Sequence, residues 1–276
     1  MRNARTLLAT GLIGTAMLTA LAEPTRAQAC GNGPEGFSRW IGAYQARAQA
    51  QGISQGAIAR GLQGVSYDSR VIRLDRGQKS FKLSFDEFYK RRVSPSLIKR
   101  GQGILSQRRA LLSKIESRYG VPGAILISIW GLETNYGGDS GGKFSIVQSL
   151  ATLAYDCRRS AFFENELTNA LRIIDRNYIA NESMRGGWAG EIGPMQFLPS
   201  SYVKYAVDFD GDGRRDLFGS VPDMLASTAN YLKQKGWRAG QPWGEGTHNH
   251  NVIREWNKAE VYVKTIAAMA SRLGGQ

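Results

Sequence analysis

Apolar positions recur at helical spacing along most of the chain, and polar residues mark where helices begin. Phe37, Trp40, Ile41 and Tyr44 form one face of a helix that Gly52 ends. The same pattern predicts helices over residues 55–62, 85–91, 95–119, 160–178 and 251–273, with further helix starts at 199–202 and 221–223. Strands are expected only near residues 144–146 and 217–218. The pattern therefore predicts a mainly α protein of the α+β class.

The most apolar run after the N-terminal segment, residues 121–133, follows a Gly120-Val121-Pro122 break and ends in Glu133. Burial raises the pKa of a carboxyl group because the charged form loses hydration, and a helix C-terminus acts in the same direction. A carboxylic acid that is still protonated near neutral pH is what general acid catalysis requires. The pattern alone leaves open an ordinary glutamate whose head group lies in solvent.

Residues 1–29 have the form of a secretory signal, with Arg2 and Arg5 before an uncharged apolar stretch and small-residue cleavage sites at 20–22 and 27–29. We therefore expect an exported, periplasmic protein. Cleavage after Ala29 leaves Cys30 as the first residue, and Cys157 is the other cysteine. Two cysteines in an exported chain favour a disulfide. Lipidation of Cys30 is the alternative, and contact with a membrane is expected only in that case.

The chain carries 36 Lys and Arg against 23 Asp and Glu, a formal net charge of +13. This excess predicts an anionic partner such as a cell-wall polymer or lipid headgroups. Export and the absence of a recognised binding motif argue against nucleic acid.

Residues 186–200 form a glycine-rich segment in which the backbone can approach a ligand closely. Gln196 in this segment offers both a hydrogen-bond donor and an acceptor, and Trp188 offers a flat face for a sugar ring. Taken alone, the segment favours a turn that contains buried aromatic residues over a binding site.

Several motifs occur in a fixed order: Glu133-x-x-x-Gly137, Gly193-x-Met195-Gln196-Phe-Leu-Pro-Ser, Ala229-Asn-Tyr231-Leu and Trp256-Asn257-x-Ala-x-Val-Tyr262. In this order they resemble the B-type membrane-bound lytic murein transglycosylases, glycoside hydrolase family 103. The resemblance covers nearly all of residues 30–276. It implies a lysozyme-like fold with a few short strands and additional N-terminal helices. We expect one domain over residues 30–276, with an N-terminal helical part (30–120), a catalytic core (121–235) and a C-terminal loop and helix that complete the cleft (236–276).

The resemblance also assigns roles to residues. The family's catalytic glutamate falls on Glu133, and the predicted substrate-binding residues are Gln196, Tyr231, Asn257, Tyr262, Trp188, Tyr136 and Met195. The chain departs from the family where Gly187 replaces a usual serine and where Glu191 adds a carboxylate near the presumed cleft. The sequence does not fix the direction of Glu191.

The resemblance implies cleavage of the MurNAc-GlcNAc β-1,4 bond of peptidoglycan with formation of a 1,6-anhydroMurNAc end. Glu133 would protonate the glycosidic oxygen and then accept the proton of the MurNAc 6-hydroxyl. The reaction needs no catalytic cofactor, and the predicted partner of the monomeric protein is the glycan strand. Two alternatives remain: a lysozyme-type hydrolase that uses Glu191 or another carboxylate as base, and a non-catalytic peptidoglycan-binding scaffold.

An acidic loop reads like the start of an EF-hand, and the family is known for a similar site. Oxygen ligands are expected from Asp208, Asp210, Asp212, Arg214 and Asp216, with Gly213 at the sharp turn. Gly219 stands where a bidentate glutamate belongs, and Asp223 is a substitute if the loop is longer. We therefore predict a structural calcium site. His248 and His250 are expected to be exposed and not to bind zinc.

Overall fold

A computed structural model describes residues 30–77, 83–139 and 142–274, so the predicted signal segment lies outside the described residues. Thirteen α-helices, one short 3₁₀ helix and one two-stranded sheet account for the regular structure of this part of the chain. The predicted mainly α architecture is confirmed. None of the helices in these ranges is long and apolar enough to cross a membrane.

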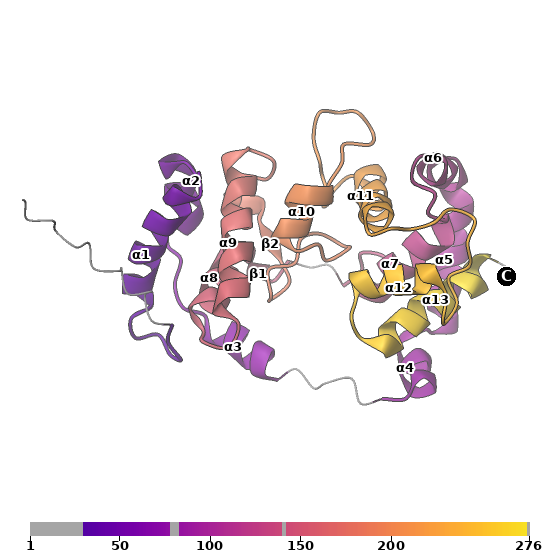
Figure 1. The fold of residues 1–276 in the computed structure, drawn as a ribbon, viewed down its shortest axis with the longest axis horizontal. Helices are drawn as coiled ribbons and strands as arrows, with labels where there is room; N and C mark the ends of the chain where they lie inside the picture. Colours follow the sequence, from indigo (N-terminus) through magenta and orange to yellow (C-terminus); the bar gives the residue numbers. More distant parts are fainter. Residues whose placement is uncertain (1–29, 78–82, 140–141, 275–276) are drawn as a thin grey trace, which may run out of the picture.

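The helices form two groups that meet where α10 contacts α11 (Figure 1). The first group contains α1 (Phe37–Ala50), α2 (Gln55–Leu62), α3 (Ser69–Arg76), α8 (Ile146–Tyr155), α9 (Ser160–Asp175) and α10 (Pro199–Tyr205). The second contains α4 (Phe85–Arg92), α5 (Pro95–Gln107), α6 (Arg109–Tyr119), α7 (Gly123–Thr134), α11 (Val221–Gln234), α12 (His248–Trp256) and α13 (Glu260–Gly274). Residues 30–120, expected as one N-terminal part, therefore contribute helices to both groups.

Helix α7 is the centre of the second group and packs against α5, α6, α11 and α13. Ile125, Leu126, Ile127 and Ile129 are fully buried on it. A helix that is apolar on all sides has to be surrounded by protein. The apolar run that drew attention to Glu133 therefore builds the core and holds the end of α7 in a fixed position.

The sheet is small and lies beside the glycine-rich segment. Strand β1 (Phe144–Ser145) pairs antiparallel with β2 (Arg185–Gly186), and a 3₁₀ turn (Asn181–Ser183) precedes β2. The strand predicted near residues 144–146 is confirmed in part. The strand predicted at 217–218 is wrong, because these residues form a turn that leads into α11.

Two helices predicted as continuous are each broken in two. The 95–119 segment turns at Arg108, which lets α5 pack on α7 and α13 while α6 packs on α7 and α11. The 251–273 segment breaks after Trp256, where the Asn257 side chain accepts a hydrogen bond from the Ala259 backbone N–H at 2.9 Å. Neither break contains glycine or proline, so local sequence gives no breaker signal. Helices α3 and α8 were not predicted.

The structure joins Cys30 and Cys157 in a disulfide, with their Cα atoms 5.0 Å apart. The bond fixes the start of the described chain to the segment after α8. A backbone hydrogen bond from Gly31 to Tyr155 supports the same attachment.

Candidate active site

Glu133 lies in the last turn of α7, and neighbouring groups fix that turn. The Thr134 hydroxyl donates to the Pro194 carbonyl at 2.6 Å, which ties the helix end to the glycine-rich loop. The Arg92 guanidinium donates to the Leu132 carbonyl. The next two residues, Asn135 and Tyr136, have positive φ angles of 55° and 59°, so the helix ends abruptly after Thr134.

The Glu133 carboxyl is hydrogen-bonded by an aromatic side chain from the other end of the sequence. The Trp256 indole Nε1–H donates to Oε1 of Glu133 at 2.9 Å. Phe197 and Tyr231 hold the indole by edge-to-face contacts, with ring centroids 5.3 and 5.2 Å away. The indole is therefore fixed by packing as well as by its hydrogen bond.

Opposing influences set the pKa of Glu133. Burial raises the pKa of this carboxyl above its ordinary value, and the nearby Glu191 acts in the same direction. The Trp256 hydrogen bond, the Tyr262 hydroxyl and the Arg92 charge lower the pKa without cancelling the effect of burial. The buried Tyr262 hydroxyl makes no hydrogen bond within the described part of the chain, and its effect on Glu133 is electrostatic. The net effect favours the protonated acid.

Glu133 opens onto a pocket of about 340 Å³. The pocket is lined by Glu133, Glu191, Gln196, Phe197, Leu198, Ser201, Tyr231, Glu255, Trp256 and Asn257. A larger pocket of about 600 Å³ lies between α5, α6, the start of α7 and residues 240–243. We place the candidate site in the smaller pocket, because it contains the half-buried Glu133 carboxyl, whose pKa is raised.

The Gln196 loop is a tight turn with an uncommon backbone. Ile192 and Phe197 exchange two backbone hydrogen bonds, of 2.7 and 3.0 Å, across the turn. Gln196 has a φ of 56°, a left-handed conformation that costs a residue other than glycine roughly 1–2 kcal/mol. Its side-chain amide donates to the Gly193 carbonyl at 2.9 Å, which orients the side chain on the pocket wall. Such backbone conformations concentrate at functional sites.

Glu191, whose direction the sequence left open, lines the same pocket as Glu133. Its Oε2 accepts a hydrogen bond from the Ala189 backbone N–H at 3.0 Å. Burial raises the pKa of the Glu191 carboxyl, and hydrogen bonds from backbone N–H groups oppose that rise. The candidate site therefore contains a second carboxyl that favours its protonated form.

Four of the residues predicted from the sequence meet in this pocket: Glu133, Gln196, Tyr231 and Asn257. Tyr262 lies behind Glu133 and does not line the pocket. Three further predicted residues are also not part of the pocket wall: Trp188, Tyr136 and Met195. Met195 is only 1% exposed, and the Tyr136 hydroxyl donates to the Leu97 carbonyl instead.

Trp256 was missed as a site residue, although it precedes Asn257 in the motif that carried the resemblance. Its position next to Asn257, a predicted substrate contact, was the signal that could have identified it. Phe197 and Leu198 also line the pocket and follow Gln196 in its motif, whereas Ser201 and Glu255 line it and carried no comparable signal.

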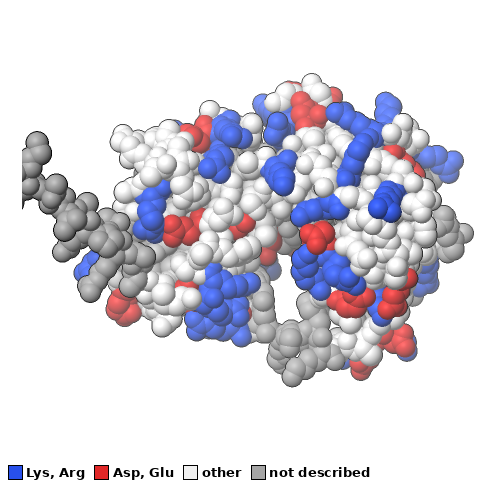
Figure 2. Space-filling model, viewed as in Figure 1, with Lys and Arg blue, Asp and Glu red and all other residues white. Residues whose placement is uncertain are grey.

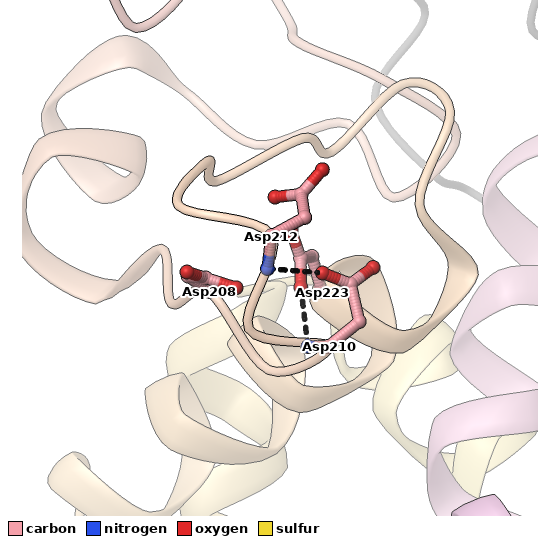
Figure 3. Close-up of side chains that lie close together, drawn as sticks. All are labelled: Asp208, Asp210, Asp212 and Asp223. Atoms are coloured by element: carbon pink, nitrogen blue, oxygen red, sulfur yellow. Dashed lines mark hydrogen bonds between the residues drawn. The ribbon is translucent and has the colours of Figure 1, made fainter.

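The acidic loop gathers four carboxylates (Figure 3), and they are Asp208, Asp210, Asp212 and Asp223. One oxygen from each lies within 4.8 Å of the others. Close carboxylate oxygens repel each other unless a cation lies between them, and hard oxygen donors suit calcium. The donor set therefore fits a calcium ion.

The cluster contains three of the five residues predicted as ligands and neither Arg214 nor Asp216. The Asp216 Oδ1 instead accepts hydrogen bonds from the backbone of Phe218 and Gly219. Asp223 takes the fourth place and is buried. Arg214 contributes a backbone N–H to the Asp212 carboxylate at 2.8 Å.

Both histidines were predicted to be exposed, and this prediction is wrong for His250. His248 is exposed, whereas His250 is buried and contacts Glu260 through Nε2 at 3.1 Å. Neither belongs to the carboxylate cluster.

Comparison with known proteins places this geometry in a family. The family model described as the transglycosylase SLT domain matches residues 36–248. Membrane-bound lytic murein transglycosylase B of Escherichia coli (strain K12) is 37% identical over 154 residues, which are 55% of this chain and 42% of that protein. The matched segment thus spans less than half the length of that relative.

Solved structures extend the comparison to most of the chain. SltB3 from Pseudomonas aeruginosa, in complex with NAG-anhNAM-pentapeptide, is 32% identical with a TM-score of 0.82, covering 87% of this chain and 80% of that one. Escherichia coli Slt35 in complex with calcium is 24% identical with a TM-score of 0.75, covering 90% and 96%. These likenesses confirm the predicted lysozyme-like fold. Since the family model covers well over half of the sequence, the chain belongs to the transglycosylase SLT domain family, as its motifs predict.

Proposed function

We propose that this protein is a lytic transglycosylase that cleaves the β-1,4 bond between MurNAc and GlcNAc in peptidoglycan. The observation that carries the proposal is the Glu133 carboxyl, which lies on a pocket, has a pKa raised by burial and receives an indole N–H on one oxygen. The solved complex of SltB3 with NAG-anhNAM-pentapeptide supports this substrate class.

Glu133 acts first as acid and then as base. Its protonated carboxyl gives a proton to the glycosidic oxygen, the bond from that oxygen to C1 of MurNAc breaks, and the electron pair stays with the leaving oxygen. The resulting carboxylate then takes the proton of the MurNAc 6-hydroxyl while O6 bonds to C1. This closes the 1,6-anhydro ring and restores the acid.

The surrounding side chains bind the sugar and stabilise charge. The Trp256 N–H stabilises the Glu133 carboxylate between the two steps. Gln196 and Asn257 present amide groups to sugar hydroxyl and acetamido groups, and Tyr231 shapes the wall through its ring.

A hydrolase mechanism is the second candidate, because Glu191 gives the pocket the pair of carboxyls that most glycosidases use. A general base has to be ionised, however, and burial raises the pKa of Glu191. Transglycosylation is therefore favoured over hydrolysis.

Digestion of purified peptidoglycan followed by mass spectrometry tests the proposal. The expected products carry anhydroMurNAc ends, lighter by one water than products of hydrolysis. Glu133→Gln is expected to lower the rate by a factor of about 10²–10⁴ while the variant still sediments with sacculi. Glu182→Gln, an exposed carboxyl outside the pocket, serves as the matched control and should retain full activity. Hydrated products alone, or an active Glu133→Gln variant, would contradict the proposal.

We also propose that the protein is exported and that calcium binds the carboxylate cluster of Asp208, Asp210, Asp212 and Asp223. Lysine and arginine side chains are spread over the face in Figure 2, and this charge favours approach to the acidic wall. Calcium would stiffen the loop before α11 and take no part in the chemistry. The calcium complex of Slt35 supports the choice of ion.

A further inference from the structure

We propose that Glu191 is a substrate-binding residue of this pocket, and that Gly187 is a glycine so that the Glu191 carboxyl can lie there. The inference deepens the proposed function and rests on it. The carboxyl would form hydrogen bonds with a hydroxyl or acetamido group of the sugar bound beside Glu133.

The position of Glu191 is set by its own loop. The Gly187 backbone N–H donates to the Glu191 carbonyl at 3.1 Å, and the Gly190 N–H donates to the Gly187 carbonyl at 3.2 Å. The Glu191 carboxyl folds back over this turn and accepts the Ala189 N–H at 3.0 Å. Among the described residues, no other residue donates a hydrogen bond to this carboxyl. Because a carboxyl has room for several hydrogen bonds, it keeps capacity for a ligand on the pocket side.

Gly187 and Glu191 occupy one space between them. A Cβ atom at position 187 would lie 2.1 Å from Oε2 and 2.9 Å from Cδ of Glu191. The next nearest atom is the side-chain oxygen of Gln196 at 3.2 Å. Gly187 does not have a positive φ, so backbone conformation does not demand glycine there. What excludes a side chain at 187 is chiefly the carboxyl of Glu191.

The pocket provides a reason for this arrangement. Glu191 lies on the wall that also carries Gln196 and Glu133, so its carboxyl faces the space in which the reacting sugar binds. The third carboxyl on the wall, that of Glu255, is paired with Lys235 at 3.2 Å and Lys258 at 2.5 Å. Glu191 has no such cation partner among the described residues. A half-buried carboxyl without an ion pair loses hydration at a cost in free energy, and hydrogen bonds from a neutral polar ligand would reduce that cost.

The experiment is a double-mutant cycle on positions 187 and 191, with Glu191→Gln as the conservative variant. The substrate is a purified tetrasaccharide of alternating GlcNAc and MurNAc units that carries stem peptides. Glu191→Ala is expected to raise KM about tenfold, the effect of one lost hydrogen bond in a desolvated site, with a smaller change in kcat. Glu191→Gln should stay within about threefold of the parent enzyme, because the amide keeps the hydrogen-bonding shape. Products should remain anhydro in every variant.

Gly187→Ala should raise KM at least as much as Glu191→Ala, because the new Cβ displaces the carboxyl. The double variant Gly187→Ala/Glu191→Ala should be no worse than Gly187→Ala alone, since the clash is then removed. This non-additivity is the signature of two residues that share one space. Thermal unfolding of each variant separates lost binding from lost folding.

An unchanged KM in Glu191→Ala, or fully additive effects of the two substitutions, would overturn the inference. A fall in the unfolding temperature with kcat and KM changed alike in Glu191→Ala and Glu191→Gln would also overturn it in favour of a structural role. Failure of the proposed function is recognised separately, because the parent enzyme would then release no anhydro product.

Discussion

Replacing Trp256 with phenylalanine removes the hydrogen bond that the indole gives to the Glu133 carboxyl, the proposed catalytic group. Phenylalanine keeps a ring between Phe197 and Tyr231 and removes the N–H that donates to Glu133 at 2.9 Å, together with part of the indole ring system, a loss that a Trp→Phe control elsewhere reproduces. This hydrogen bond lowers the pKa of Glu133, so its loss raises that pKa further. The acid then stays protonated to higher pH, and the alkaline limb of the kcat/KM profile moves upward.

The size of the effect on rate follows from the charge that the indole stabilises. A hydrogen bond to a charged group contributes about 1.5–3 kcal/mol, which corresponds to roughly 10–150-fold. Because the Glu133 carboxylate exists only after proton donation, we expect kcat to fall by about this factor while KM changes little.

The assay is the initial rate of anhydro-muropeptide release between pH 4 and pH 9. Trp243→Phe is the matched control, because its indole N–H donates to the Ala267 carbonyl and the Ser271 hydroxyl away from the pocket. An alkaline limb that moves downward, or a kcat equal to that of the control, would refute the role assigned to Trp256.

Three further predictions follow from the same structure. Glu133→Gln should raise the unfolding temperature by roughly 2–4 °C for each kcal/mol of stability gained. The gain should be larger at pH 8 than at pH 4, because the folded-state pKa of Glu133 lies above its unfolded value and the parent protein therefore loses stability as pH rises through this range. At a free calcium concentration 100 times the dissociation constant, the free energy of unfolding measured by calorimetry should rise by about 2.7 kcal/mol. Asp223→Asn should abolish that gain, whereas Asp216→Asn should retain it; the reverse pattern would contradict the cluster. Cys30→Ser should cost about 2–5 kcal/mol in denaturant unfolding, and native intact mass should correspond to a disulfide with Cys157 and no lipid.

Part of the signal for Glu133 is local, and the resemblance of the ordered motifs then assigned its role. A carboxylate at the end of an uncharged apolar run is visible without any knowledge of the fold, and the structure buries that run on all sides of α7. The glycines around Gln196 indicate a turn locally, whereas the resemblance assigned Gln196 to the site. Features that depend on neighbours within a few residues are therefore readable from the chain.

The contact between Trp256 and Glu133 could not be predicted from the sequence, because it depends on how distant helices pack. Trp256 reaches Glu133, 123 residues earlier, because the chain leaves α12 at Asn257 and starts again at α13. The break contains no glycine or proline, and it is held by the Asn257 side chain and by packing of α13 on α7. Long-range packing thus decides which aromatic residue serves the carboxyl.

The environment of Glu133 suits the proposed role, in which one carboxyl is acid and base in turn. Burial alone would keep the carboxyl protonated but would strongly disfavour the carboxylate that the proposed second step needs. Trp256, Tyr262 and Arg92 counteract this, because they interact favourably with the charged form. Each of them therefore has its greatest effect after the proton has left. A single carboxyl can serve both steps because its environment disfavours ionisation in the resting enzyme and limits the cost of ionisation during the reaction.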